Sequence, residues 1–283
     1  MREEKLRDVE TAMYECRLIL GQNPENRPYS SVVVDEGQDF SMMAFRLLRA
    51  LTGGEHVDDM FIVGDAHQRI YKNKTVLLKC GINIRGRSSR LKINYRTTEE
   101  TRKYAFRLLM NIPFDNMDDE YDDGRICQSL THGNPPQIER FTGAAEEAEF
   151  IVAELKQLIG HGVYPQNICI VARTHKLLDD YIVQLKNAGI KTYEIKRSKL
   201  DDRSFEGVRV ATMHRVKGLE FQYVFVAAVN KCIIPLAAAI DETDKVSEIE
   251  SIKAERCLLY VALTRAQKVA YITSYGVQSE FIE

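Results

Sequence analysis

Three carboxylates follow two short runs of apolar, mostly β-branched residues, and their placement suits phosphate chemistry. Asp35 and Glu36 come directly after the apolar residues 32–34, and Asp65 follows a second such run at 60–63. Because an open parallel sheet binds ligands outside the carboxyl ends of its strands, these side chains are candidates for a binding edge. One carboxylate of an adjacent pair can hold Mg²⁺ while the next orients and deprotonates water. Taken alone, such a pair also fits an ordinary polar strand end.

Four further segments occur downstream. They read Gly-Asp-Ala-His-Gln-Arg-Ile-Tyr at 64–71, Asn-Tyr-Arg-Thr at 94–97, Thr-Met-His-Arg-Val-Lys-Gly-Leu-Glu-Phe at 212–221 and Tyr-Val-Ala-Leu-Thr-Arg-Ala at 260–266. Together with Asp-Glu-Gly-Gln-Asp at 35–39, this set resembles motifs II to VI of superfamily 1 helicases of the UvrD, Rep and PcrA type. The resemblance implies an ATP-dependent 3′-5′ DNA helicase or translocase. Its cofactors would be ATP and Mg²⁺, and its partner single-stranded or partly duplex DNA.

The resemblance assigns the phosphate chemistry to five residues. Asp35 would hold Mg²⁺ through water, and Glu36 would act as general base on the attacking water. Gln68 would sense the γ-phosphate, while Arg96 and Arg265 would contact it as fixed positive charges. Because phosphoryl transfer depends mainly on charge placed around the γ-phosphate, these residue types suit the task. For each arginine, the plain alternative is a surface ion pair.

The nucleoside would be held by a second group of residues. Tyr95 stands where the family stacks an aromatic ring on adenine, although tyrosine is also a common core residue. Glu220 corresponds to the residue that hydrogen-bonds the ribose. Gly218 permits the tight backbone turn that precedes Glu220.

Three residues are expected to contact the DNA strand. Thr212 offers a hydroxyl to phosphate, His214 an imidazole to the backbone or a base, and Tyr71 a ring for base stacking. Residues 72–74 depart from the family, which commonly continues with another aromatic residue and an arginine, so one stacking platform is expected to be missing or displaced. The basic run 85–92 adds local positive charge, although an ordinary solvated loop explains it as well.

Alternating strands and helices must position these residues. Strands are predicted at 31–35, 60–64, 90–94, 137–141, 168–172, 208–212, 223–229 and 269–273. Helices are predicted at 1–20, 97–110, 144–159, 176–188 and 247–265, and residues 111–136 as a solvated loop. This alternation implies parallel β-α-β units in an α/β fold. The resemblance makes it the RecA-like P-loop NTPase fold, with parallel sheets flanked by helices.

Composition sets the broad class. Of the 283 residues, 45% are hydrophobic and 28% charged, which excludes disordered and collagen-like chains. Because 39 basic residues balance 41 acidic ones, the net charge by itself does not indicate a nucleic-acid partner. The six cysteines form no C-x-x-C pair, and the N-terminus is charged. These features favour a reduced, cytoplasmic protein without a signal peptide or membrane span.

One element of the family is absent from this sequence. ATP binding requires a P-loop, G-x-x-x-x-G-K-[ST], yet no Gly-Lys pair occurs. Residues 1–90 are therefore expected to form a partial first motor domain that lacks the P-loop strand, which leaves an apolar edge at 32–34. Residues 91–283 would form a second motor domain, with only a short link at 196–207 in place of the family's large insertion. The P-loop would come from a missing N-terminal segment or a partner chain.

Two other functions stay open. A catalytically incomplete DNA- or protein-binding subunit or fragment would need no P-loop of its own. The presence of Glu36, Gln68, Arg96 and Arg265 favours descent from an active motor. A nuclease would need a cluster of carboxylates and lysine outside these motifs, and the sequence offers none.

Overall fold

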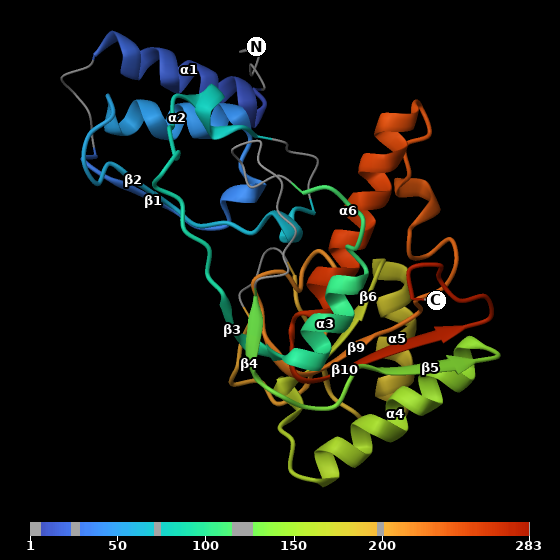
Figure 1. Ribbon diagram of the computed structural model, residues 1–283. Helices are drawn as coiled ribbons and strands as arrows, with labels where there is room; N and C mark the ends of the chain where they lie inside the picture. The colour runs from blue at the N-terminus through green and yellow to red at the C-terminus, as the bar shows by residue number, and fades with distance from the viewer. Residues whose placement is uncertain (1–6, 24–28, 71–74, 115–126, 197–200, 283) are drawn as a thin grey trace, which may run out of the picture. The chain divides into compact units, whose positions relative to one another are not determined.

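The computed structural model describes residues 7–23, 29–70, 75–114, 127–196 and 201–282 (Figure 1). The chain divides into two compact units. The first comprises Met1–Arg90 and Pro113–Gly124, and the second comprises Leu91–Ile112 and Arg125–Glu283.

The described residues of the first unit form a small parallel sheet and two α-helices. Strand β1 (Val32–Val34) pairs in parallel with β2 (Met60–Ile62), and α2 (Met42–Thr52) connects them. Helix α1 (Val9–Gln22) precedes the sheet and packs against α2. Short 3-10 turns at Gly37–Asp39, Ala66–Gln68 and Leu77–Cys80 complete this unit.

One face of this sheet is covered and the other is open. Val34 packs with Phe45 of α2 and with Leu77 in a buried cluster. The paired residues Val33 and Phe61 point the other way and are 75% and 64% exposed. Within the described residues β1 pairs with β2 alone, so its second edge carries no strand.

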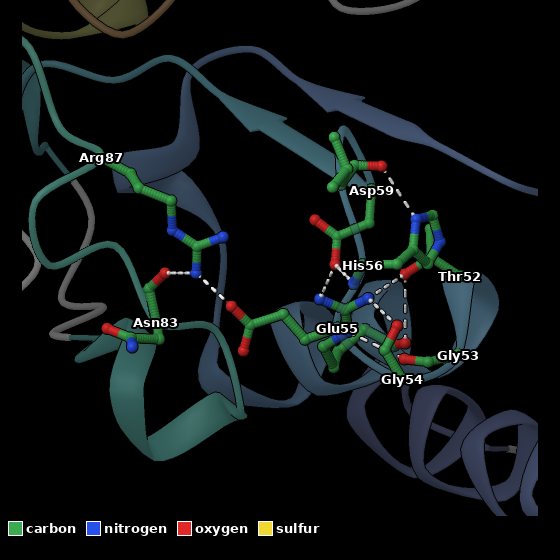
Figure 2. Close-up of polar contacts among 10 residues, drawn as sticks. Thr52, Gly53, Gly54, Glu55, His56, Asp59, Asn83 and Arg87 are labelled. Carbon is green, nitrogen blue, oxygen red and sulfur yellow. Dashed lines mark hydrogen bonds and ion pairs between the residues drawn. The ribbon is translucent and has the colours of Figure 1, made fainter.

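Polar contacts hold the loop that returns the chain from α2 to β2 (Figure 2). The Arg49 guanidinium donates to the Asp59 carboxylate at 2.6 Å and to the Gly53 carbonyl at 3.0 Å. Nearby, Arg87 binds the Glu55 carboxylate, as Figure 2 shows. These contacts fix the amino end of β2. The residues that follow β2, including Asp65, therefore lie at the carboxyl end of the sheet.

The second unit is built on six parallel strands in the order β5-β10-β9-β6-β8-β7. The strands are β5 (Gln137–Phe141), β6 (Ile168–Ala172), β7 (Thr192–Glu194), β8 (Val208–Thr212), β9 (Phe221–Val226) and β10 (Ala266–Tyr275). All residues of β6 and β8 are buried, as expected for strands covered on both faces. The predicted α/β fold with a parallel sheet is confirmed.

Helices flank this sheet (Figure 1). Residues of α4 (Ala144–Gly160) and α5 (His175–Asn187), such as Leu155 and Leu185, pack with alternate residues of β6, β8 and β9 in one buried cluster. Helices α3 (Glu99–Arg107) and α6 (Lys245–Leu263) contact each other and the strand β10, and α6 also contacts β9.

The predicted loop 111–136 was partly wrong. Residues Gln128–Thr131 form β4, which pairs in parallel with β3 (Ile93–Thr98). The prediction failed because β4 is short and mostly polar, so it carries no apolar alternation. Tertiary contacts hold it, including the Ser129 amide, which donates to the Glu99 carboxylate at 2.7 Å. Strand β7, three residues long, also went unpredicted.

A buried arginine organises the short link that precedes β8. Arg209 is fully buried and donates to the carbonyls of Phe205 and Gly207, each at 2.7 Å. Its Nε donates to the Asp201 carboxylate at 3.0 Å, and its guanidinium lies 5.0 Å from the centre of the Tyr193 ring. The Arg209 side chain, which belongs to β8, thus holds residues 201–207 against the sheet.

Candidate functional site

Asp35 and Glu36 lie at the carboxyl end of β1. Asp35 is exposed, and its Oδ1 accepts a hydrogen bond from the Glu36 amide at 2.8 Å. Glu36 has φ 53°, in the left-handed region, where a residue with a Cβ is disfavoured by about 1–2 kcal/mol. Backbone strain of this kind clusters at functional sites. The proposed general base therefore occupies a conformation that its own residue type does not favour.

Gly37 makes this turn possible. Its amide donates to the Val63 carbonyl at 2.8 Å, which brings the turn close to the end of β2. A Cβ at this position would lie 3.0 Å from Ile62 Cγ2 and 3.2 Å from the Val63 oxygen. The close approach therefore favours glycine, and it holds Glu36 beside the carboxyl end of the neighbouring strand.

The ends of β1 and β2 are joined by a hydrogen-bond network. The buried Gln38 donates to the Glu36 carboxylate, and its Oε1 accepts from the Asp65 amide at 2.9 Å. Gln68 in turn donates to the Asp65 carboxylate at 2.9 Å. Burial opposes ionisation of Asp65, but hydrogen bonds from His67 and Gln68 hold its pKa below the usual range. Glu36 and Gln68 are therefore connected through Gln38 and Asp65.

These carboxylates supply the hard oxygen ligands that Mg²⁺ prefers. Within the described parts of the chain, no group of three or more His, Cys, Asp or Glu side chains forms a complete metal cage. Magnesium usually keeps several waters and binds one or two carboxylates together with substrate phosphates. Asp35 and Glu36 therefore fit a Mg²⁺ ion that arrives with a nucleotide.

Two predicted nucleotide residues, Arg96 and Glu220, meet in the second unit. Arg96 lies in β3, and its Nε donates to Glu220 Oε1 at 2.5 Å. The other carboxylate oxygen of Glu220 accepts from Gln267 at 3.0 Å. Burial opposes ionisation of Glu220, yet the hydrogen bond and charge of Arg96 lower its pKa. Glu220 is thus an anion held between two donors.

Arg265 lies next to this pair. The Phe221 amide donates to the Arg265 carbonyl at 3.0 Å, so Glu220 and Arg265 precede neighbouring strands at the same edge of the sheet. The Arg265 side chain is 1% exposed, and its Nε donates to the Val261 carbonyl at 3.1 Å. Its positive charge contributes to the lowered pKa of Glu220.

The remaining residues that are predicted to hold the nucleotide are Tyr95 and Gly218. Tyr95 is 73% exposed, so it is no core residue in this structure. Gly218 has φ 80°, a backbone conformation that suits glycine, and it turns the chain two residues before Glu220. The Tyr95 ring is thus open to solvent and Gly218 forms the expected turn, while the nucleotide roles of both residues stay predictions.

Thr212 and His214 lie at the opposite edge of the same sheet. Thr212 ends β8, and its carbonyl accepts from the amides of Arg215 and Val216 at 2.8 and 3.1 Å. Burial and the charge of Arg173 lower the pKa of His214, which favours a neutral imidazole at neutral pH. Because β8 and β9 are parallel to β6, the segment 213–220 runs from the carboxyl edge back to the amino edge. In this unit, the predicted DNA residues thus lie at the carboxyl ends of the strands, and the predicted nucleotide residues lie at the amino ends.

A buried ion pair between Arg173 and Glu255 lies close enough to His214 to influence its pKa. Arg173 and Glu255 form two hydrogen bonds, at 2.9 and 2.7 Å, and Glu255 also accepts from the Leu236 amide at 3.0 Å. The pair joins the end of β6 to α6. Sequence reasoning missed it, because no local pattern connects residues 82 positions apart.

Sequence reasoning also missed the roles of Gln38 and Gln267. Gln38 lies inside the motif at 35–39, so its position in the motif could have indicated a role in the site. Gln267 follows the last motif, and nothing in the sequence indicated its role. The predicted stacking residue Tyr71 lies outside the described residues. In the basic run, Arg85 is exposed and Arg87 pairs with Glu55.

No helix in the described ranges combines the length and apolar composition needed to cross a membrane.

Comparisons with known proteins point to one family. The family model for the UvrD-like helicase C-terminal domain matches residues 89–204 and 185–276, and the model for the UvrD/REP helicase N-terminal domain matches residues 1–76. A probable DNA helicase from Mycoplasma pneumoniae is 24% identical over 274 residues, which cover 93% of this chain and 48% of that protein. The ATP-dependent DNA helicase PcrA of Staphylococcus aureus is 42% identical over 67 residues, which cover 24% of this chain and 9% of PcrA.

A solved structure, the C-terminal domain of a possible DNA helicase from Lactobacillus plantarum, is 18% identical with a TM-score of 0.47. The match covers 67% of this chain and 92% of that one. The chain spans about half the length of the Mycoplasma helicase and a smaller share of PcrA. Since the two segments of the C-terminal family model together cover most of the chain, the protein belongs to the UvrD-like helicase family.

Proposed function

We propose that this chain forms part of an ATP-dependent DNA helicase or translocase motor that moves 3′ to 5′ on single-stranded DNA. The observation that carries the proposal is the cluster of Arg96, Glu220 and Arg265 at the amino edge of the six-stranded sheet. Three residues from separate motifs, which the family uses for nucleotide, converge there. In this proposal residues 1–90 form part of the first motor domain and residues 91–283 form the second.

The carboxyl edge of the first unit would carry the hydrolytic chemistry. Glu36 would take the proton of the attacking water, and Gln38 holds its carboxylate by a hydrogen bond. Asp35 would hold Mg²⁺ through water, which supplies positive charge beside the β- and γ-phosphates. Gln68 would contact the γ-phosphate from its position on Asp65.

Nucleotide and DNA would use separate sites on the second unit. Tyr95 would stack on adenine, and Arg96 and Arg265 would place positive charge at the γ-phosphate. Thr212 and His214 would contact the DNA strand at the other edge of the sheet. A neutral imidazole suits this role, because it can both donate and accept hydrogen bonds.

A second candidate is a catalytically incomplete DNA- or protein-binding subunit or fragment. The observation in its favour is the absence of any Gly-Lys pair, and hence of a P-loop, from the 283 residues. In that case the phosphate cradle would come from another segment or another chain. The residues at the carboxyl edge of the first unit and at the amino edge of the second would then support hydrolysis only after this phosphate cradle is supplied.

One experiment separates the two candidates. ATP hydrolysis by the chain alone is measured with and without oligothymidine, for the unchanged protein and for Glu36→Gln. Robust turnover that depends on DNA and on Glu36 supports the motor and contradicts incompleteness. DNA binding without turnover supports the incomplete subunit. Unwinding of partial duplexes with 3′ or 5′ tails tests the direction, since a 3′-5′ motor opens the 3′-tailed duplex.

A further inference from the structure

A β-bulge lies directly beside the Arg96–Glu220 pair. Along β9 and β10 the partners are Ala266 with Phe221 and then Val269 with Tyr223, so β10 carries one extra residue. A bulge turns a side chain away from the direction that regular alternation would give it, and bulges are common next to active sites. Here the extra residue falls at Gln267 or Lys268, where the Gln267 side chain reaches Glu220 at 3.0 Å.

The contacts of Arg96 leave part of its guanidinium available. Its Nε donates to Glu220, whereas its two terminal nitrogens make no hydrogen bond among the described residues. The Arg96 side chain is 35% exposed. A guanidinium presents its donors as a rigid fork, so a carboxylate at Nε fixes the direction of the terminal nitrogens.

We infer that Gln267 and Glu220 are positioning residues that aim the terminal nitrogens of Arg96 at a phosphate group. The β10 bulge delivers Gln267 to one oxygen of Glu220, and the other oxygen holds Arg96 Nε. This inference rests on the proposed nucleotide role of Arg96. It gives Glu220 a task other than ribose binding, and it brings Gln267 into the site.

The two tasks of Glu220 predict different ligand dependence. A residue that binds only ribose affects ATP but has no effect on a ligand without a sugar. A residue that positions Arg96 affects every ligand that carries the same phosphates. Inorganic tripolyphosphate, which lacks both sugar and base, therefore separates them.

The experiment is a nuclear magnetic resonance titration of the full chain with ATP and, separately, with tripolyphosphate. The variants are Q267L, E220Q and R96A, and Gln184→Leu is the matched control. Gln184 is an exposed glutamine on α5 whose side chain makes no hydrogen bond to the residues that the structure describes. In the ligand-free protein, solvent exchange of the Arg96 Nε proton reports directly on the Arg96–Glu220 bond.

Q267L is expected to speed exchange of the Arg96 Nε proton. It should also weaken the binding of both ligands about two- to tenfold, because binding must then order the Arg96 side chain. E220Q removes a negative charge, so electrostatics alone predicts tighter binding of tripolyphosphate. The positioning role predicts weaker binding instead. The double variant Q267L/E220Q should be no weaker than E220Q, since both act through Arg96. Gln184→Leu should match the unchanged protein.

Three results would overturn the inference. If Q267L leaves both affinities unchanged while R96A weakens them, Arg96 binds nucleotide but is not positioned by Gln267. If E220Q weakens ATP alone, Glu220 acts on the sugar. If R96A has no effect on ATP, the proposed nucleotide role of Arg96 fails, and the inference fails with it.

Discussion

The left-handed backbone of Glu36 allows a direct test of strain at the proposed catalytic turn. We expect the variant Glu36→Gly to be more stable than Glu36→Ala, the reverse of the usual order. Both substitutions remove the hydrogen bond that the carboxylate accepts from Gln38, so that loss cancels in the comparison. Only glycine relieves the conformational cost of φ 53°.

The magnitude follows from two opposing effects. A Cβ in the left-handed region costs about 1–2 kcal/mol. Glycine gives the unfolded chain extra freedom, which lowers stability by about 0.4–1 kcal/mol relative to alanine. The net expectation is that Glu36→Gly exceeds Glu36→Ala by about 0.5–1 kcal/mol in free energy of unfolding. The same pair of substitutions at Arg85, which does not have a positive φ, should favour alanine.

Urea unfolding of the full chain gives the free energies, and hydrogen exchange localises the effect. The Val63 amide donates to the Val34 carbonyl at 2.8 Å, so its exchange rate reports opening of the β1–β2 sheet. Slower exchange is expected in Glu36→Gly than in Glu36→Ala. Equal stability of the two variants, or a more stable alanine variant, would refute the argument from strain.

Three further predictions concern the second unit. Replacing the fully buried Arg209 with methionine removes the guanidinium that donates to three loop carbonyls, those of Asp202, Phe205 and Gly207, and should cost about 3–5 kcal/mol in urea unfolding. A hydrogen bond from Arg102 lowers the pKa of Glu99 from 4.5 to about 2. Because the folded pKa is depressed, this stabilisation is present above pH 4.5 and is lost as the pH falls towards 2, which unfolding measured across that range will show. Tyr181→Phe removes the hydroxyl that donates to the buried Glu147 carboxylate, at a cost of about 1.5–3 kcal/mol in thermal or urea unfolding.

Each of these predictions has a matched control. The exposed Arg140 and Tyr164 should tolerate methionine and phenylalanine, respectively, with little change in stability. Glu99→Gln should flatten the pH dependence of stability between pH 4.5 and 2. A fully retained slope in Glu99→Gln, or an Arg209→Met protein as stable as its Arg140→Met control, would contradict the corresponding contact.

Much of the second unit was predictable from local pattern. The buried strands β6 and β8 are continuous apolar or β-branched runs, except for Arg209. Glu220 and Arg265 were singled out by the family resemblance, because each lies inside one of its motifs. What the motifs did not reveal is their mutual arrangement, such as the bond between Arg96 and Glu220, which are 124 positions apart.

The unpredicted features share a physical cause, since each depends on tertiary contact. Strand β4 exists through pairing with β3 and a bond to Glu99, whereas its own residues have little strand character. Arg209 interrupts an apolar strand, and only the folded link supplies the carbonyls that satisfy its charge. Gln267 reaches Glu220 because of a bulge, which no spacing rule indicates.

We propose that nucleotide and DNA use opposite edges of the six-stranded sheet in the second unit. Hydrogen–deuterium exchange of the full chain tests it most directly, with Mg²⁺ and ATP in one arm and oligothymidine in the other. ATP should protect segments that contain Arg96, Glu220 and Gln267, and oligothymidine should protect the segment from Thr212 to His214. Protection of the same segments by both ligands, or no protection around Arg96 and Glu220 at saturating ATP, would contradict separate nucleotide and DNA sites.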